Sequence, residues 1–448
     1  MAPRKLRLIP ILAPQPKRRK PKLTTVILSF FAVVGCIIFY LGLKLAAPSV
    51  SSIKRTKSLL PTFVKPAPHL LPSKAALNQV NLYVNLTIST GSFRYQESSS
   101  CKTHSNCEIH FPYLDLETAS PDKISDMQEK TDIRSDLAVL TRKGSKALVT
   151  NVKVNQDRSF IISPLELGEE TSLATGPDDF MVGLFDGHGE LGHGTAHFAA
   201  MELPPLLLRT MQRQRKFIPT KAASDDVVAA LKESFVHLDD NIPFLETSGS
   251  TGIIILRVGN TLFFGSTGDS QAFLVKADTS FEDKVGVSIV HATVPHKPEG
   301  LEAKRIISSG GQVMPKTAED VSARVVITIP NALTLALAMS RCLGDAEGKK
   351  QNVLIADPNV DVIDLDQLKK ESSATDQYFV VAASDGLLDR VPPLLVAQRI
   401  AMSLYKESPS QPLVACQDLI QESSMMWGEL VGVEYRDDIS IAVKRVHL

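Results

Sequence analysis

The sequence lacks a surplus of charge of either sign. Its 448 residues contain 49 Lys and Arg against 49 Asp and Glu, so the formal net charge is zero. A basic surplus creates the field that attracts nucleic-acid phosphates, and this chain has no such surplus overall. We therefore expect no nucleic acid among its partners. The length corresponds to about two or three domains of ordinary size.

Acidic residues are missing from the amino-terminal part of the chain. No Asp or Glu precedes Glu97, whereas the first 96 residues contain fifteen Lys and Arg. Because the total is zero, the rest of the chain is mildly acidic. The sequence therefore reads as two parts joined end to end, a basic amino-terminal segment and a slightly acidic body.

Charge of both signs is missing between Leu23 and Leu43, a run of 21 residues. As a helix this run would be about 32 Å long, enough to cross the hydrocarbon core of a bilayer. The apolar region of a cleaved signal peptide is shorter, about 7–15 residues. We predict a basic tail at 1–22, a transmembrane helix at 23–43, a stalk at 44–130 and a globular domain at 131–448.

The sequence leaves open on which side of the membrane the globular domain lies. Eight basic residues precede the apolar run, and five follow it up to Lys65. The positive-inside rule then favours a cytoplasmic amino end with the body beyond the membrane, where Asn85 in the stalk would be a glycosylation acceptor. A basic start without acidic residues also resembles an organelle transit segment. We expect a single-pass membrane protein of undetermined organelle.

Cysteine is scarce, with five residues in the whole chain, so we do not expect a domain built on disulfides. Cys101 and Cys107 could close a small loop in an oxidising compartment. Together with His104 and His110 they also form an alternating pattern that could in principle hold zinc. This even spacing matches no structural zinc pattern, and we interpret it as a coincidence.

Short apolar strands and amphipathic helices follow one another from about Arg134 onward. Two apolar runs around Gly259 and Asn260 predict a hairpin, and segment 298–311 begins with a proline and ends in glycines, as helices do. Segments 392–408 and 412–426 predict two late amphipathic helices. Hairpins mixed with helices indicate an α+β fold rather than a doubly wound parallel sheet.

Aspartates stand at the ends of several predicted strands. Each one alone has an ordinary explanation as a turn former or a helix cap. Several together, with few Cys or His residues beside them, indicate an oxygen-ligand site that suits Mg²⁺ or Mn²⁺, whereas zinc prefers nitrogen and sulfur. These aspartates are Asp157, Asp186, Asp269, Asp385 and Asp437.

The glycines around Asp186 permit a different interpretation. Gly187, Gly189 and Gly192 fit the G-x-G-x-x-G expression of a dinucleotide-binding loop, which would make the protein a nucleotide-dependent oxidoreductase. The carboxylate of Asp186, however, stands where a phosphate would approach, and no second half-domain of parallel units follows. We therefore interpret this turn as an aspartate metal site with a histidine beside it.

Nine short motifs occur in a characteristic order along the chain. They are RKG (142–144), NQDR (155–158), FDGHG (185–189), GST (249–251), GDSQA (268–272), HKP with EAKRIISSGGQV (296–313), LAMSRCLGD (337–345), AASDGLLD (382–389) and RDDIS (436–440). In this order they resemble the metal-dependent protein phosphatases of type 2C, over roughly 134–446. The resemblance implies an α-β-β-α sandwich, with two central antiparallel β-sheets packed face to face and flanked by α-helices. It also implies a monomer that dephosphorylates serine and threonine in phosphoproteins.

The resemblance implies roles for individual residues. His188 matches the proposed general acid, which protonates the leaving oxygen while water activated by two or more Mg²⁺ or Mn²⁺ ions attacks phosphorus directly. Asp186 matches the catalytic carboxylate that bridges two metal ions. The implied metal ligands are Asp157, Asp186, the carbonyl of Gly187, Asp269, Asp385, Asp389 and Asp437, of which Asp269 and Asp389 match an additional, weaker site.

The chain departs from the family pattern at two places. Gln156 stands where many relatives have Glu, and Val152 stands nearest the place of an arginine that grips phosphate. Lys153 and Arg158 are therefore the predicted phosphate-binding residues, although a lysine meets phosphate as a point charge and not as a bidentate fork. Segment Glu299–Leu335 matches the family's variable flap and is expected to bias substrate choice.

Two further histidines, His193 and His197, match no functional position of the family. We expect them to be solvated residues of the loop and of the helix that follow the FDGHG motif. The rival interpretation for the whole chain is a catalytically inactive protein that binds phosphoproteins. The loss of a direct metal ligand would favour that rival, and none of these ligands is lost.

Overall fold

The computed structural model describes most of the predicted globular domain. The predicted tail and transmembrane helix, Lys153 and all of the stalk except Ile109–His110 lie outside the described residues. Within the described part of the chain, no helix is both long enough and apolar enough to cross a bilayer. The structure describes residues 109–110, 135–144, 155–165, 176–189, 191–213, 221–242, 247–316, 322–329, 334–407, 410, 412–431 and 435–448.

Two antiparallel sheets form the centre of the fold. The first sheet has the strand order β1-β3-β4-β7-β8-β15 and consists of β1 (Ile109–His110), β3 (Arg158–Ile162), β4 (Phe180–Phe185), β7 (Gly252–Val258), β8 (Thr261–Thr267) and β15 (Asn359–Asp364). The second has the order β10-β9-β16-β17-β2 and consists of β10 (Gly286–Ala292), β9 (Gln271–Asp278), β16 (Asp376–Ala383), β17 (Ile439–Val446) and β2 (Leu137–Arg142).

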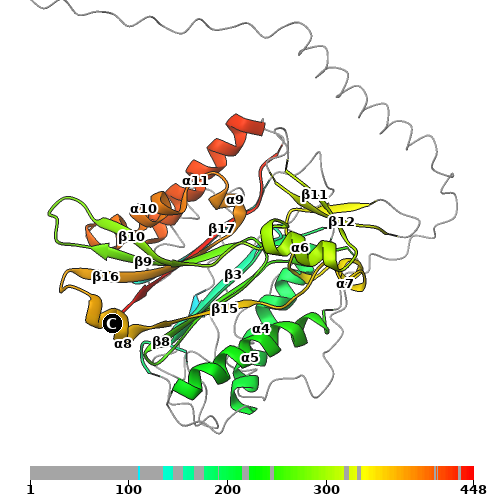
Figure 1. Ribbon diagram of the computed structural model, residues 1–448. Coiled ribbons are helices and arrows are strands. Elements are labelled where there is room, and N and C mark those ends of the chain that lie inside the picture. The colour runs from blue at the N-terminus through cyan, green and yellow to red at the C-terminus, as the bar shows by residue number, and fades with distance from the viewer. Residues whose placement is uncertain are drawn as a thin grey trace, which may run out of the picture. The chain divides into compact units, whose positions relative to one another are not determined.

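Helices cover the outer face of each sheet. Helices α4 (Gly192–Arg213) and α5 (Lys221–Asp239) share an apolar cluster with the first sheet, and α10 (Pro393–Tyr405) and α11 (Pro412–Val431) share another with the second. A third cluster fills the space between the two sheets. Figure 1 shows the resulting four layers. The predicted α+β fold with antiparallel sheets and flanking helices is confirmed.

The strands carry apolar residues at successive positions because both of their faces are buried. In β7, Ile253 and Ile255 belong to the cluster between the sheets, while Ile254 and Leu256 face helices α4 and α5. Alternate side chains of a strand point to opposite faces, so a strand inside a four-layer sandwich needs apolar residues at every position. The predicted hairpin is also present, because β7 and β8 pair across Gly259, whose φ of 57° favours glycine.

Smaller elements extend the sandwich at one end. Helix α6 (Gly300–Ser308) and the sheet of β11 (Gln312–Met314), β12 (Arg324–Ile327) and β13 (Leu335–Leu337) share a small apolar cluster with the segment around Leu354. This region contains the predicted variable flap. A second small sheet joins β5 (Gly187–His188), β6 (Gly249–Ser250) and β14 (Leu343–Gly344). It brings the FDGHG motif next to the LAMSRCLGD motif.

Candidate functional site

The antiparallel pairing brings the aspartates to common sheet edges. Arg158 at the start of β3 pairs with Phe185 at the end of β4, so Asp157 and Asp186 lie at the same edge of the first sheet. In the second sheet, Ala383 at the end of β16 pairs with Gln271 at the start of β9 and with Ile441 near the start of β17. The residues just beyond these strand ends are Asp385, Asp269 and Asp437.

Hydrogen bonds then join the two edges. The Asp186 amide donates to Thr251 Oγ1 at 3.0 Å, and the Thr251 hydroxyl lies 2.8 Å from the hydroxyl of Ser270, the neighbour of Asp269. On the other side, the Ser384 hydroxyl donates to Asp157 Oδ2 at 3.0 Å. These bonds bring the strand ends that precede or follow the aspartates of both sheets to the same end of the sandwich.

The charges of neighbouring aspartates act on Asp385. Removal from water raises the pKa of Asp385 well above its usual value, and the charges of Asp269, Asp437 and Asp389 raise it further. The same two causes raise the pKa of Asp389. Like charges this close disfavour ionisation unless a cation stands among them. These four aspartates interact electrostatically with one another, and we call Asp269, Asp385, Asp389 and Asp437 the acidic cluster.

The acidic cluster fits hard divalent cations. Its donors are carboxylate oxygens, which Mg²⁺ and Mn²⁺ prefer. Oδ1 of Asp269 is buried and has no hydrogen-bond partner among the described residues, so this oxygen is available as a metal ligand. At Gly187, whose carbonyl is a predicted ligand, a β-carbon would lie 2.4 Å from the oxygen of Gly192 and 2.7 Å from that of Gln156. Only glycine permits this close packing.

Lys297 is a residue of the site that the sequence reasoning missed. Its Nζ lies 2.5 Å from Asp269 Oδ2. Removal from water would lower the pKa of Lys297, but the charges of Asp269, Asp385 and Asp389 outweigh it and raise that pKa. Lys297 supplies positive charge to the acidic cluster. The HKP motif contains Lys297, but no residue spacing connects position 297 to aspartates at 269 and 385.

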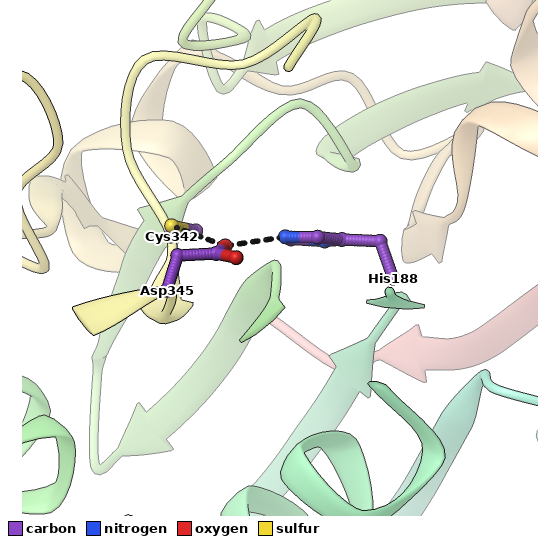
Figure 2. Close-up of side chains that lie close together, drawn as sticks. All are labelled: His188, Cys342 and Asp345. Atoms are coloured by element: carbon purple, nitrogen blue, oxygen red, sulfur yellow. Dashed lines mark hydrogen bonds and ion pairs between the residues drawn. The ribbon is translucent and has the colours of Figure 1, made fainter. Parts of the chain in front are cut away.

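His188 is held by the LAMSRCLGD motif. Its Nε2 lies 2.5 Å from Asp345 Oδ2, and the Cys342 thiol donates to the same oxygen at 3.2 Å, as Figure 2 shows. Asp345 is 1% exposed and has a left-handed backbone with φ of 49°. Burial alone would raise the pKa of Asp345, but the charge and hydrogen bond of His188 outweigh it and lower that pKa. Neither contact was foreseen from the sequence.

The expectation that His197 is solvated was wrong, whereas His193 is half-buried. His197 is 5% exposed, and burial, with a contribution from the charge of Arg158, lowers its pKa to about 3. Burial and the same arginine lower the pKa of the half-buried His193 to about 4. Both residues lie in α4, which packs against the first sheet, and His197 is a buried, neutral residue of this helix.

The structure describes one of the two departures from the family pattern, Gln156, because Val152 lies outside the described residues. The side-chain amide of Gln156 donates to the Gly189 carbonyl at 2.7 Å and so anchors the loop after His188, which an ionised Glu could not do because it has no donor. Arg158 is 2% exposed and donates to the carbonyls of Asn155 and Asp157 at 2.7 and 2.6 Å. Its predicted contact with phosphate stays a prediction.

Comparison with known proteins identifies one family. A family model described as protein phosphatase 2C matches residues 158–426. Probable protein phosphatase 2C 72 of Arabidopsis thaliana is 28% identical over 319 residues, which are 70% of this chain and 88% of that protein. Probable protein phosphatase 2C 64 of Oryza sativa subsp. japonica is 28% identical over 266 residues, 59% of this chain and 58% of that protein.

A solved structure supports the fold. The serine-threonine phosphatase 2C of Toxoplasma gondii superposes with a TM-score of 0.52 at 17% sequence identity, over 70% of this chain and 95% of that one. At this identity the likeness concerns the arrangement of strands and helices. The four-layer sandwich is therefore shared with a known structure.

Proposed function

The chain belongs to the protein phosphatase 2C family, and from this premise we propose how its residues bind and hydrolyse a phosphoprotein. Members of this family are metal-dependent protein serine/threonine phosphatases, and the chain is an enzyme of this class. The proposed substrate is phosphoserine or phosphothreonine in a protein, and the proposed active form is a monomer.

The proposed metal ligands are the carboxylates at the ends of the two sheets. The observation that carries this proposal is that the strand ends next to these aspartates pair with one another and that Ser384, beside Asp385, donates a hydrogen bond to Asp157. Divalent cations, when bound there, supply a water nucleophile of lowered pKa and a clamp on the phosphoryl oxygens. Asp186, the carbonyl of Gly187, Asp385 and Asp437 are the proposed direct ligands of two Mg²⁺ or Mn²⁺ ions, with Asp157 beside them, and Asp269 and Asp389 are the proposed ligands of a further ion.

His188 is the proposed proton donor to the leaving serine or threonine oxygen. The protonated ring is the form that can donate, and an anionic partner stabilises that form. Asp345 is such a partner at 2.5 Å, and its buried, doubly hydrogen-bonded carboxylate fixes the orientation of the imidazole. Asp345 acts through His188, so we assign it as a positioning residue.

Hydrolysis of a phosphoserine peptide by the full chain, with Mn²⁺ or Mg²⁺, tests this proposal. We expect turnover that a chelator abolishes and that Asp186→Asn removes while the fold persists. Asp361→Asn is the matched control, because Asp361 is a 44% exposed carboxylate on β15 that contacts His291 and not the acidic cluster. A chain that binds the phosphopeptide without turnover under every metal condition would instead be an inactive phosphoprotein-binding module.

We further propose that the uncharged run at 23–43 anchors the enzyme in a membrane. The support for this proposal is the length of that run and the basic residues on both sides of it. Sealed vesicles that carry the full chain with a carboxyl-terminal tag, treated with protease, report the side of the catalytic domain. Glycosylation at Asn85 would identify a luminal stalk. Release of the chain from vesicles by high salt alone would contradict the anchor.

A further inference from the structure

Three side chains of different chemistry meet at the small sheet of β5, β6 and β14. His188 Nε2, Cys342 Sγ and an oxygen of Asp345 all lie within 4.8 Å of one another. They come from β5 and from the turn that surrounds β14, two segments that the small sheet brings together (Figure 2). Asp345 and Cys342 are buried, whereas the His188 side chain is 18% exposed and gives the group an opening to solvent.

The donor atoms of this group differ from those of the acidic cluster. One imidazole nitrogen, one sulfur and one carboxylate oxygen form a set that zinc prefers, and zinc commonly takes three protein ligands with a water as the fourth. Mg²⁺ and Mn²⁺ favour oxygen donors and have little affinity for a thiolate. The two groups of ligands would therefore select different ions.

We propose that His188, Cys342 and Asp345 form a second metal site, selective for thiophilic divalent cations such as Zn²⁺, whose occupation switches the phosphatase off. The inhibitory part of this inference rests on the proposed function of His188. The binding part rests only on the geometry of the three ligands.

The charge balance of the site is favourable. When Zn²⁺ binds, the Cys342 thiol loses its proton to solvent and a sulfur–zinc bond forms. The imidazole presents the lone pair of Nε2 and keeps its proton on Nδ1, and an imidazolium would release one proton more. Zn²⁺ with one thiolate and one carboxylate is neutral overall, and a neutral group is far less costly to bury than a charged one.

The geometry needs only a small adjustment. Zinc–ligand bonds of about 2.0–2.3 Å in a tetrahedron separate neighbouring ligand atoms by about 3.3–3.6 Å. The present separations are 2.5 Å between Nε2 and Oδ2 and 3.2 Å between Sγ and Oδ2. The ion would therefore replace the two shared hydrogens as the side chains move apart by up to about 1 Å. Oδ1 of Asp345, buried and without a hydrogen-bond partner among the described residues, offers a second donor.

Occupation of this site would stop catalysis through His188. A nitrogen bound to zinc no longer pairs with Asp345, and the ring can no longer serve as the oriented proton donor of the reaction. Because the ion is held by nitrogen and sulfur, saturating Mg²⁺ would not displace it. Inhibition by zinc should then persist in excess Mg²⁺ and be relieved by a chelator that prefers zinc.

Cobalt serves as the spectroscopic probe, because a thiolate bound to Co²⁺ gives a near-ultraviolet charge-transfer band and carboxylates do not. Co²⁺ is titrated in saturating Mg²⁺ into the full chain, with Cys36, Cys101 and Cys107 replaced by serine, so that Cys342 and Cys416 remain of the five cysteines. We expect a band that saturates at one equivalent. Cys342→Ser should abolish the band. Cys416→Ser is the matched control, a buried free cysteine of α11, and should keep it.

Two further measurements keep the inference open to refutation. Should Cys342→Ser fail to fold, His188→Ala removes a partly exposed ligand and should weaken cobalt binding at least about 100-fold while the thiol is kept. Zinc should inhibit hydrolysis in the parent, and Cys342→Ser should need at least about 100-fold more zinc. A band that is absent from the parent, or that survives Cys342→Ser, overturns the site. A band that follows Cys342 in a chain without phosphatase activity keeps the site and refutes the proposed function instead.

Discussion

Replacement of Asp345 by Asn removes the charge behind His188 and little else. Asn has nearly the same shape and tolerates the left-handed backbone at φ of 49°, so the fold should persist. The lost contact is a 2.5 Å hydrogen bond to a 1% exposed carboxylate. A hydrogen bond to a charged group contributes about 1.5–3 kcal/mol. If this contribution acts in the transition state, kcat falls by about 10- to 150-fold.

The assay compares two substrates that differ in their need for a proton. A phosphoserine peptide releases an alkoxide that must be protonated, whereas an aryl phosphate with a strongly acidic phenol releases a stable anion. Asp345→Asn should lower kcat for the peptide by about 10- to 150-fold and leave kcat for the aryl ester nearly unchanged. Equal losses for both substrates, or no loss for either, would refute the assignment of Asp345 as a positioning residue.

Asp239→Asn is the matched control for this experiment. Asp239 accepts a hydrogen bond from the Gly344 amide at 2.7 Å and pairs with Lys349, so it supports the same turn as Asp345. Its carboxylate interacts with that turn and not with His188. We expect this variant to unfold at lower urea concentration while its ratio of peptide to aryl-ester turnover stays that of the parent.

Two more predictions concern stability and are read from urea unfolding. A β-carbon at Gly386 would lie 1.9 Å from the Asp438 carbonyl oxygen, so Gly386→Ala should lower the free energy of unfolding by about 1–3 kcal/mol or more. Gly428 lies in open space on α11, so Gly428→Ala should raise that free energy by about 0.5–1 kcal/mol. Burial would raise the pKa of Glu302, but Arg341 lowers it to about 2 from 4.5. The stability that this pair contributes is present above pH 4.5 and is lost as the pH falls toward 2, so Glu302→Gln should flatten the acid limb of the stability curve. Parallel acid limbs for parent and variant, or equal stability of the two glycine variants, would contradict these accounts.

The layers of the fold were predictable because their signals are local. Continuous apolar strands such as Gly252–Val258 predict burial on both faces, and the glycine at 259 marks the turn between two strands. The aspartates at strand ends were predictable as a group, since antiparallel pairing places the end of one strand beside the start of the next. That the two sheets pack face to face between layers of helices was predicted from the family resemblance and not from the strands themselves.

The rest of the site depends on contacts between distant positions. Asp345 lies 157 residues from His188, and no periodicity connects them. His197 was expected in solvent because it matches no functional position of the family, but it is 5% exposed on α4, and burial keeps it neutral. Lys297 was not predicted as a site residue for the same reason as Asp345, because its contact with Asp269 depends on which segments the fold brings together. Tertiary packing and not local sequence decided these three positions.

Calorimetric titration of Mn²⁺ at neutral pH tests the central claim most directly, because it measures the cations themselves. The account predicts that the full chain binds at least two Mn²⁺ ions and that Asp385→Asn loses at least one of them, while Asp361→Asn binds as the parent does. A parent chain that takes up no Mn²⁺, or an Asp385→Asn variant whose number of sites and affinities equal those of the parent, would contradict it.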